Sequence, residues 1–336
     1  MRKTLQSSIC VLLLFTSWNG FAAAECDADG DVQFLCGPVS PEDLAQVPDS
    51  PWVVASGMED DGYLYFTNSD DLSTTAVYPA ANARHELIDR FADCPGPLTS
   101  GFRPHGVNLV RGENGIHTLL VVRHGDRESI EVFEIQETSS TPELTWIGCV
   151  IAPDGIVFNS VVATPERGMA ATHMNLPMGA VYEWQPGADW EQVPGSESAG
   201  PNGIEISPDG KWFYIGGWGT RSIIKLSRGQ SEVIVDSVDL PHHVDNVRWS
   251  TDGSLLAAGH VGPEMSSIIT CLSQQQCDGV STRVTRVDVN NLTAREIINY
   301  PSNPQFLLGT VAIEIGNEVW VGGIAGSNRI ARFEYR

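Results

Sequence analysis

The sequence predicts an all-β protein, a six-bladed β-propeller with a metal site in its central channel. Three observations carry this prediction. Short strand-like runs alternate with turns along almost the whole chain, one strand-entry pattern recurs, and five of its six copies open on a polar residue. Asn159, Asn202 and Asn246 lie at or directly after the start of successive copies, at spacings of about 43 and 44 residues, which is typical of propeller blades.

The strand-like runs combine apolar and β-branched residues with turn signals on either side. Asp-Gly turns between alternating runs, as at Pro208–Gly210 and Asp252–Gly253, indicate β-hairpins. No long amphipathic helix is expected. The predicted strands are Trp52–Ser56, Thr118–Val122, Ile130–Ile135, Gly203–Ile206, Trp212–Gly216, Leu255–Gly259, Thr310–Glu314 and Glu318–Gly322.

Six copies of the strand-entry pattern predict six blades. They begin at Glu42, His105, Asn159, Asn202, Asp245 and Gly309. In a propeller the innermost strand of each blade lines the channel, so the first residues of these strands should meet at one end of it. A single Asn or Asp at a strand entrance is explained by a local turn, but several at equivalent positions favour a shared site.

The first 24 residues read as a secretory signal peptide. Arg2 and Lys3 precede the apolar run from Ile9 to Phe15, and small residues end at Ala24, near which cleavage is expected. Residues 25–336 are predicted to form a single propeller domain, secreted or periplasmic, without a stable membrane anchor. The formal net charge of −22 opposes binding to nucleic acid.

Six cysteines follow the predicted signal peptide, and an even number in a secreted chain suggests disulfide bonds. Cys26 with Cys36, and Cys271 with Cys277, are close enough in sequence to close local loops. Cys94 and Cys149 then remain as a pair, although six cysteines allow fifteen connectivities.

The converging polar residues have the chemistry of a calcium site. Glu42 and Asp245 offer carboxylates, and Asn159, Asn202 and Asn246 offer amide oxygens. Ca²⁺ takes six to eight oxygen ligands of this mixture, whereas structural zinc prefers cysteine and histidine. A calcium left open on one side can polarise a carbonyl and stabilise an oxyanion.

Two histidines are candidates for the catalytic base. His105 opens one channel strand, and His124 ends the neighbouring strand of the same blade. Paired imidazoles can activate a water, one as the base and the other as its orienting partner. His260 and, more weakly, His243 are candidate substrate contacts. Asp245 is an alternative base that would also touch the metal.

These motifs resemble the paraoxonase (arylesterase/lactonase) family, within the gluconolactonase-like six-bladed propellers. The similar segments, in order, are Pro41–Leu44, Pro104–Val107, Leu119–His124, Asn202–Gly210, Val244–Asn246 and Gly259–His260. The resemblance covers the chain from about Glu42 to its end.

The resemblance implies a catalytic calcium held by the five oxygen ligands given above. It also implies a second, structural calcium deeper in the channel, with Asp43 and the carbonyl of Val107 among its ligands. The family places an Asp at the third ligand position, where this chain has Ser160, so the second calcium stays an open question. The family's disulfide between the N-terminal segment and the last strand is also missing, which leaves closure to strand pairing.

The function these features predict is calcium-dependent hydrolysis of a small-molecule lactone, with aryl esters as a secondary substrate class. Apolar residues at Phe102, Met174–Met178 and Trp218 favour a hydrophobic lactone over a polyol. The alternatives are a sugar lactonase of the gluconolactonase type, a propeller like strictosidine synthase, and a non-catalytic propeller whose calcium is structural.

Overall fold

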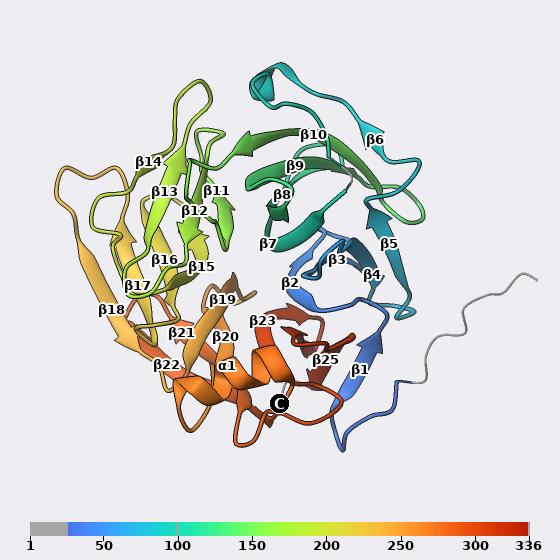
Figure 1. Cartoon of the computed structure of the whole chain (residues 1–336), viewed down its shortest axis with the longest axis vertical. Helices are drawn as coiled ribbons and strands as arrows, with labels where there is room; N and C mark the ends of the chain where they lie inside the picture. Colours follow the sequence, from blue (N-terminus) through green and yellow to red (C-terminus); the bar gives the residue numbers. More distant parts are fainter. Residues whose placement is uncertain (1–25, 99, 335–336) are drawn as a thin grey trace, which may run out of the picture.

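The computed structural model describes residues 26–98 and 100–334, which form six sheets around a central channel, antiparallel apart from one short outer strand (Figure 1). This arrangement confirms the predicted six-bladed propeller. The predicted signal peptide lies outside the described residues.

The first three blades contain the following strands, from the channel outward. Blade 1 has β2 (Pro41–Gln46), β3 (Trp52–Gly57), β4 (Leu64–Asn68) and β5 (Thr74–Tyr78). Blade 2 has β7 (Phe102–Val110), β8 (Ile116–Gly125), β9 (Ser129–Gln136), β10 (Glu143–Ile151) and, parallel to β10, the short β6 (Arg84–His85). Blade 3 has β11 (Val161–Ala163), β12 (Met169–His173), β13 (Ala180–Trp184) and β14 (Glu191–Gln192).

The last three blades follow the same plan. Blade 4 has β15 (Pro201–Ile206), β16 (Trp212–Gly217), β17 (Ser222–Ser227) and β18 (Val235–Asp239). Blade 5 has β19 (His243–Trp249), β20 (Leu255–Val261), β21 (Ser281–Asp288) and β22 (Thr293–Pro301). Blade 6 has β23 (Leu308–Ile315), β24 (Glu318–Ile324), β25 (Arg329–Glu334) and, outermost, β1 (Gln33–Cys36). All eight predicted strand runs lie within these strands.

Blade 6 closes the ring by joining the two ends of the described chain. Strand β1 pairs antiparallel with β25, from Gln33 opposite Arg332 to Cys36 opposite Arg329. Leu35 of β1 is buried in a cluster with Leu44 of the first blade and Trp320 of the last. Strand pairing and apolar packing therefore close the propeller, as the absence of a late cysteine predicts.

Three disulfides link the cysteine pairs expected from their spacing. Cys26 bonds to Cys36, Cys94 to Cys149, and Cys271 to Cys277. The second bond ties the segment after the 3-10 turn η1 (Asp89–Phe91) to the outer strand β10, and the third joins Cys271 within the helix α1 (Met265–Gln274) to Cys277 just beyond it. The first two bonds thus involve the outer strands β1 and β10, and the third lies in the connection between β20 and β21.

Helix α1 interrupts the otherwise all-β chain between β20 and β21. It has ten residues and buries only Ile268 and Cys271 fully, so it is a short surface helix and not a core element. No helix in the described ranges, this one included, is long and apolar enough to cross a membrane.

The inner strands share an irregularity that positions the site. The pairing of the first two strands shifts register at Pro41/Asp43, Pro104/Val107, Pro201/Ile204, Val244/Val247 and Gly309/Val311. A β-bulge of this kind kinks the strand and re-aims the side chains within it. Five of the six blades therefore carry a bulge at the same end of the channel.

Candidate active site

The predicted site residues lie in or beside these bulges. Glu42, His105, Asn202, Asp245 and Asn246 fall within the shifted segments, and Asn159 lies two residues before β11 in the remaining bulge-free blade. In Figure 1, β2, β7, β11, β19 and β23 surround the channel. The bulges of four blades, together with Asn159 beside β11 in a fifth, thus bring residues from five blades to one end of the channel.

Direct contacts link these residues into a ring. The amide Nδ2 of Asn246 donates to Glu42 Oε1 at 2.6 Å, and His105 Nε2 lies 3.7 Å from the same oxygen. Asn202 donates a side-chain hydrogen bond to Asp245. The backbone N–H of Gly106 donates to the carbonyl of Asn159 at 3.2 Å, which joins blades 2 and 3 beside His105.

Four side-chain oxygens of the ring are buried without a hydrogen-bond partner. They are Oε2 of Glu42 and the amide oxygens of Asn159, Asn202 and Asn246. A buried polar atom without a partner is costly, and native proteins rarely leave one so. Four in one ring, all hard oxygens, form a donor set that fits a bound Ca²⁺.

In the described part of the chain, acidic and histidine side chains do not form a metal site by themselves, because three of the five proposed ring ligands are asparagine amides. Over residues 26–98 and 100–334, no group of three or more His, Cys, Asp or Glu side chains could hold a metal ion. Two carboxylates and three amides make up the ring instead. Oxygen-only coordination with several neutral ligands suits calcium, not zinc or copper.

The ring carboxylates sit in a strongly unfavourable field. Burial, then repulsion from Asp43 and Asp245, raises the pKa of Glu42 well above its ordinary value. Burial likewise raises the pKa of Asp245 to about 7, although the hydrogen bond from Asn202 lowers it. A cation held between the two carboxylates would oppose both effects.

His105 belongs to a chain of three hydrogen-bonded side chains. Its Nδ1 lies 2.9 Å from His124 Nε2, and His124 Nδ1 lies 2.7 Å from the carboxylate of Glu128. The carboxylate can only accept, so His124 donates to it through Nδ1–H and accepts at Nε2 from the Nδ1–H of His105. This order leaves Nε2 of His105 with a free lone pair, facing Glu42.

The surroundings keep His105 neutral. Burial, then the positive charges that His124 and Arg103 can carry, lowers its pKa well below the ordinary value. A neutral imidazole with a bare nitrogen can accept a proton from water, so the geometry and the charge state both suit a base.

A second wall of the site consists of His260, His243 and Trp218. The indole N–H of Trp218 donates to His260 Nε2 at 3.0 Å, and His243 Nδ1 donates to the Trp218 carbonyl at 2.6 Å. His260 Nδ1 lies 3.9 Å from Asp245 Oδ2, so this wall adjoins the ring. Burial lowers the pKa of His260 to about 4, and it is therefore neutral at pH 7.

Two residues of the predicted deeper calcium site are engaged by an arginine. Arg248 Nη2 pairs with Asp43 Oδ2 and donates to the Val107 carbonyl at 2.6 Å. The backbone N–H of Val107 donates to the same Asp43 oxygen at 2.7 Å. Ser160, at the third expected position, is fully buried.

One residue expected near the substrate belongs to the core instead. Phe102 is fully buried and packs edge-on against Tyr78 at a centroid distance of 5.1 Å. Its apolar character therefore says nothing about the substrate. Trp218 does adjoin the site, and Leu176 and Met178 are exposed on the loop between β12 and β13.

Sequence reasoning missed Glu128, Trp218 as a hydrogen-bond donor, and Arg248. Glu128 follows His124 by four residues across the hairpin between β8 and β9, a spacing that gives no signal outside a helix. Arg248 lies on an inner strand, where its position two residues after Asn246 places it on the channel side. The alternation of side chains along this strand could therefore have predicted that Arg248 faces the channel.

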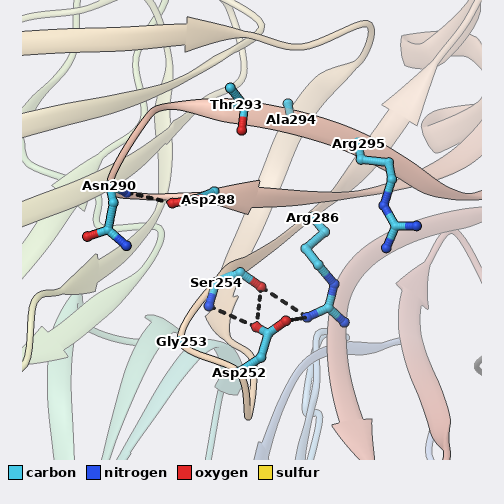
Figure 2. A pocket seen from close by; sticks show the side chains of 9 residues that line it. All are labelled: Asp252, Gly253, Ser254, Arg286, Asp288, Asn290, Thr293, Ala294 and Arg295. Carbon is cyan, nitrogen blue, oxygen red and sulfur yellow. Dashed lines mark hydrogen bonds and ion pairs between the residues drawn. The ribbon is translucent and has the colours of Figure 1, made fainter.

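The pocket in Figure 2 lies away from this site. It has a volume of about 320 Å³ and surrounds the Asp252–Gly253 turn at the far end of β19 from Asp245. Arg286 Nη1 pairs with Asp252 Oδ2 at 2.7 Å, and Ser254 N donates to Asp252 Oδ1 at 2.9 Å. These bonds among the lining residues stabilise the turn and give no sign of a ligand.

Similarity to known proteins agrees with the fold. Serum paraoxonase/arylesterase 1 of Homo sapiens is 28% identical over 201 residues, which cover 52% of each chain. The chain thus spans about half the length of the curated relative it matches. A solved gluconolactonase of Xanthomonas campestris matches with a TM-score of 0.52, 13% identity and coverage of 90% of this chain and 89% of that one.

A second solved structure is the calcium-binding protein regucalcin of Agrobacterium tumefaciens, with a TM-score of 0.53, 12% identity, and coverage of 89% of this chain and 93% of that one. At such identities these structures show a common fold. The family model described as "SMP-30/Gluconolactonase/LRE-like region" matches residues 55–261, more than half of the chain. The chain therefore belongs to the SMP-30/gluconolactonase/LRE-like family of six-bladed propellers.

Proposed function

We propose that this protein is a secreted, calcium-dependent hydrolase that opens lactones and, as a secondary activity, cleaves aryl esters. The observation that carries the proposal is the contact between two features. A neutral histidine with a free Nε2 faces Glu42, in a ring with four partnerless buried oxygens. Metal-assisted hydrolysis requires a general base beside a bound metal ion, and this arrangement would provide both.

The ring residues would hold the metal through oxygen. Glu42, Asp245 and the three asparagines supply the ligands, and their two negative charges balance a divalent ion. When bound there, calcium would polarise the substrate carbonyl and stabilise the negative oxygen that forms on attack.

His105 would remove a proton from the attacking water through Nε2. The water oxygen bonds to the lactone carbonyl carbon, and the ring C–O bond then breaks. The imidazolium returns its proton to the departing alkoxide oxygen, which yields a hydroxy acid and restores the neutral base. His124 fixes the tautomer of His105, and Glu128 fixes that of His124, so both are positioning residues.

The relatives support the reaction class and the metal. The human relative is called a paraoxonase and arylesterase, the family model names gluconolactonase, and regucalcin is called calcium-binding. The three disulfides agree with an oxidising compartment, as secretion requires.

A sugar lactonase is the second candidate function, and the gluconolactonase name of the matching family favours it. His243, His260 and the Trp218 carbonyl offer polar groups that could bind a polyol. Asp245 is a second candidate for the base, because its carboxylate lies in the ring itself, 3.9 Å from His260 Nδ1.

A panel of lactones tests the proposal. The mature protein is offered aliphatic γ- and δ-lactones, aromatic lactones, a sugar lactone and phenyl acetate. Preference for aliphatic or aromatic lactones supports the proposal, whereas preference for the sugar lactone supports the second candidate. Failure to hydrolyse any of them, by protein shown to be folded and calcium-loaded, would leave a non-catalytic calcium-binding propeller.

A further inference from the structure

The inner strands carry a second cluster of charged groups, below the ring. Its centre is Arg248, whose side chain is 7% exposed. We propose that the Arg248 guanidinium is a built-in cation that takes the place of a second metal ion, so that the protein holds a single calcium. This inference rests on the proposed calcium ring, because that ring is where the single ion would bind.

The guanidinium binds groups from several blades around the channel. Its Nη2 bonds Asp43 of blade 1 and the Val107 carbonyl of blade 2, and Nε donates to the Leu44 carbonyl at 3.3 Å. Its Nη1 donates to the Val247 carbonyl at 2.8 Å and lies 3.6 Å from Glu205 of blade 4. One carboxylate and three carbonyl oxygens, with a second carboxylate nearby, form an oxygen shell of the kind that surrounds a buried cation.

This shell lies deeper than the ring. Val107 follows His105 by two residues, Glu205 follows Asn202 by three, and Arg248 follows Asn246 by two. Two residues of a strand cover about 7 Å, so the guanidinium lies roughly that far along the channel from the ring. The two positions are close enough for their charges to interact.

A metal ion does not fit the deeper position. Asp43 Oδ2 and the Val107 carbonyl, two of the three ligands that the family resemblance implies, are already bonded to Arg248. The third position carries Ser160, which offers a neutral hydroxyl where a carboxylate is expected. The chain thus lacks one anionic ligand and supplies its own positive charge.

The two replacements are consistent with each other electrostatically. Compared with the second calcium site that the family resemblance implies, this cluster lacks one carboxylate and one divalent ion and gains one guanidinium. Its net charge is therefore about the same. Buried charge needs such compensation, because an unpaired buried carboxylate is strongly destabilising. A covalently attached cation also cannot be removed by a chelator, so the channel floor should persist when the calcium is withdrawn.

Calcium stoichiometry tests the inference directly. The mature protein, stripped by chelation and shown by circular dichroism to be folded, is titrated calorimetrically with Ca²⁺. We expect one equivalent to bind. Two equivalents would overturn the inference and leave the calcium ring standing. No binding would overturn both, since the inference counts one ion in the ring.

A charge-removing variant provides a second readout. In Arg248→Gln the ring loses a neighbouring positive charge, so the Kd for Ca²⁺ should tighten by at least about threefold. The matched control is Arg228→Gln, because Arg228 also binds two carboxylates, Glu166 and Glu183, but away from the channel. Its Kd should equal that of the wild type. An unchanged Kd in folded Arg248→Gln would contradict the inference.

If Arg248→Gln fails to fold, Arg248→Lys replaces it. An ammonium keeps the charge but cannot bond several oxygens as a planar fork. We expect a lower Tm than wild type with a Kd for Ca²⁺ within about twofold of it. An unchanged Tm would show that the oxygen shell does not need the guanidinium, and would count against the inference.

Discussion

Two features set His105 apart from the protein's other described histidines. Its Nδ1 is committed to His124, whose own Nδ1 is held by Glu128, and its Nε2 faces a ring of ligand oxygens. The hydrogen bonds decide which nitrogen of His105 carries the proton, and burial keeps its imidazole neutral. Together they turn an ordinary imidazole into a directed proton acceptor.

His105→Gln should therefore lower kcat for lactone hydrolysis by about 10²- to 10⁴-fold, the range typical of a lost general base. Tm and the Kd for Ca²⁺ should stay close to wild type, because the amide fills similar space and no metal ligand is lost. His85→Gln, on the exposed strand β6, is the control and should keep full activity. If His105→Gln retains wild-type turnover, Asp245 becomes the leading candidate for the base.

The sequence was informative about residues that repeat and silent about those that do not. Glu42, Asn202 and Asp245 share a position in the blade repeat, so their convergence could be predicted from spacing. Glu128 lies in a hairpin turn and Trp218 in a loop, and their roles arise from contacts that no periodicity encodes. Phe102 was misread, because an apolar residue looks the same in a core and in a pocket.

His242 links the site region to the pH dependence of stability. It is fully buried, and burial, followed by repulsion from His260, lowers its pKa to about 3. In the unfolded chain His242 takes up a proton near pH 6.5, whereas in the folded protein it stays neutral at that pH. The free energy of unfolding therefore falls as the pH drops below about 6.5. At pH 5 this single group should account for about 2 kcal/mol.

His242→Gln cannot take up that proton. Urea unfolding at pH 7 and pH 5 should show a smaller difference in the free energy of unfolding for the variant than for wild type, by up to about 2 kcal/mol. His85→Gln should show the wild-type difference. An equal pH dependence in His242→Gln and wild type would mean that His242 already takes up its proton in the folded protein at pH 5.

At the scale of elements, the bulge is the device that builds the site. Register shifts in four blades leave Glu42, His105, Asn202, Asp245 and Asn246 outside the regular pairing of their strands, at the channel end. Glycine follows the site residue in two of them. A Cβ on Gly106 would lie 2.6 Å from the Asn159 carbonyl oxygen, and one on Gly203 would lie 2.6 Å from the Cα of Asn246. Neighbouring inner strands can approach only because these side chains are missing.

Gly106→Ala should push blade 3 away from His105. The clash is with backbone atoms, which cannot rotate aside, so the Kd for Ca²⁺ should weaken by at least about tenfold and stability should fall. Gly253→Ala is the control, because its φ of +80° penalises alanine by about 1–2 kcal/mol but leaves open space around the Cβ. Only the first variant should change the Kd. Equal Kd values would show that Asn159 is not a ligand.

The regular strands were predictable and the bulges were not. Continuous apolar runs such as Trp212–Gly216 are buried on both faces between neighbouring blades, and such a run is recognisable from its composition. A register shift depends on the pairing of two strands, so one strand alone does not reveal it. The short helix α1 lies in a connection whose sequence has no core-facing stripe of ordinary length.

At the scale of the whole molecule, the circle of six blades is closed by β1, which belongs to the last blade. This closure fixes all six inner strands relative to one another and leaves only short, protected sheet edges toward the channel. Glu42 and Asn246 are 204 residues apart in the sequence, and the position of one relative to the other therefore depends on this closure. Stability and metal affinity should be coupled through it.

Leu35→Ala tests how much the packing of β1 contributes to this closure. Leu35 is 1% exposed in the cluster between the first and last blades, so its truncation should lower the free energy of unfolding by roughly 2–5 kcal/mol. Val235→Ala, on the outer strand β18 with 53% exposure, should change it by no more than about 0.5 kcal/mol. Urea unfolding compares the two variants, and equal losses in the free energy of unfolding would show that the packing of β1 does not stabilise the closed propeller.

The most direct test of the central claim is hydrolysis of the preferred lactone by chelator-treated protein as Ca²⁺ is added back. Wild type and Asn202→Leu are measured side by side, with circular dichroism as the folding control. The proposed calcium ring predicts that activity disappears on chelation and returns with Ca²⁺ in the wild type, whereas the variant, without one amide ligand, needs far more Ca²⁺ or stays inactive. Hydrolysis that survives complete chelation would contradict the claim.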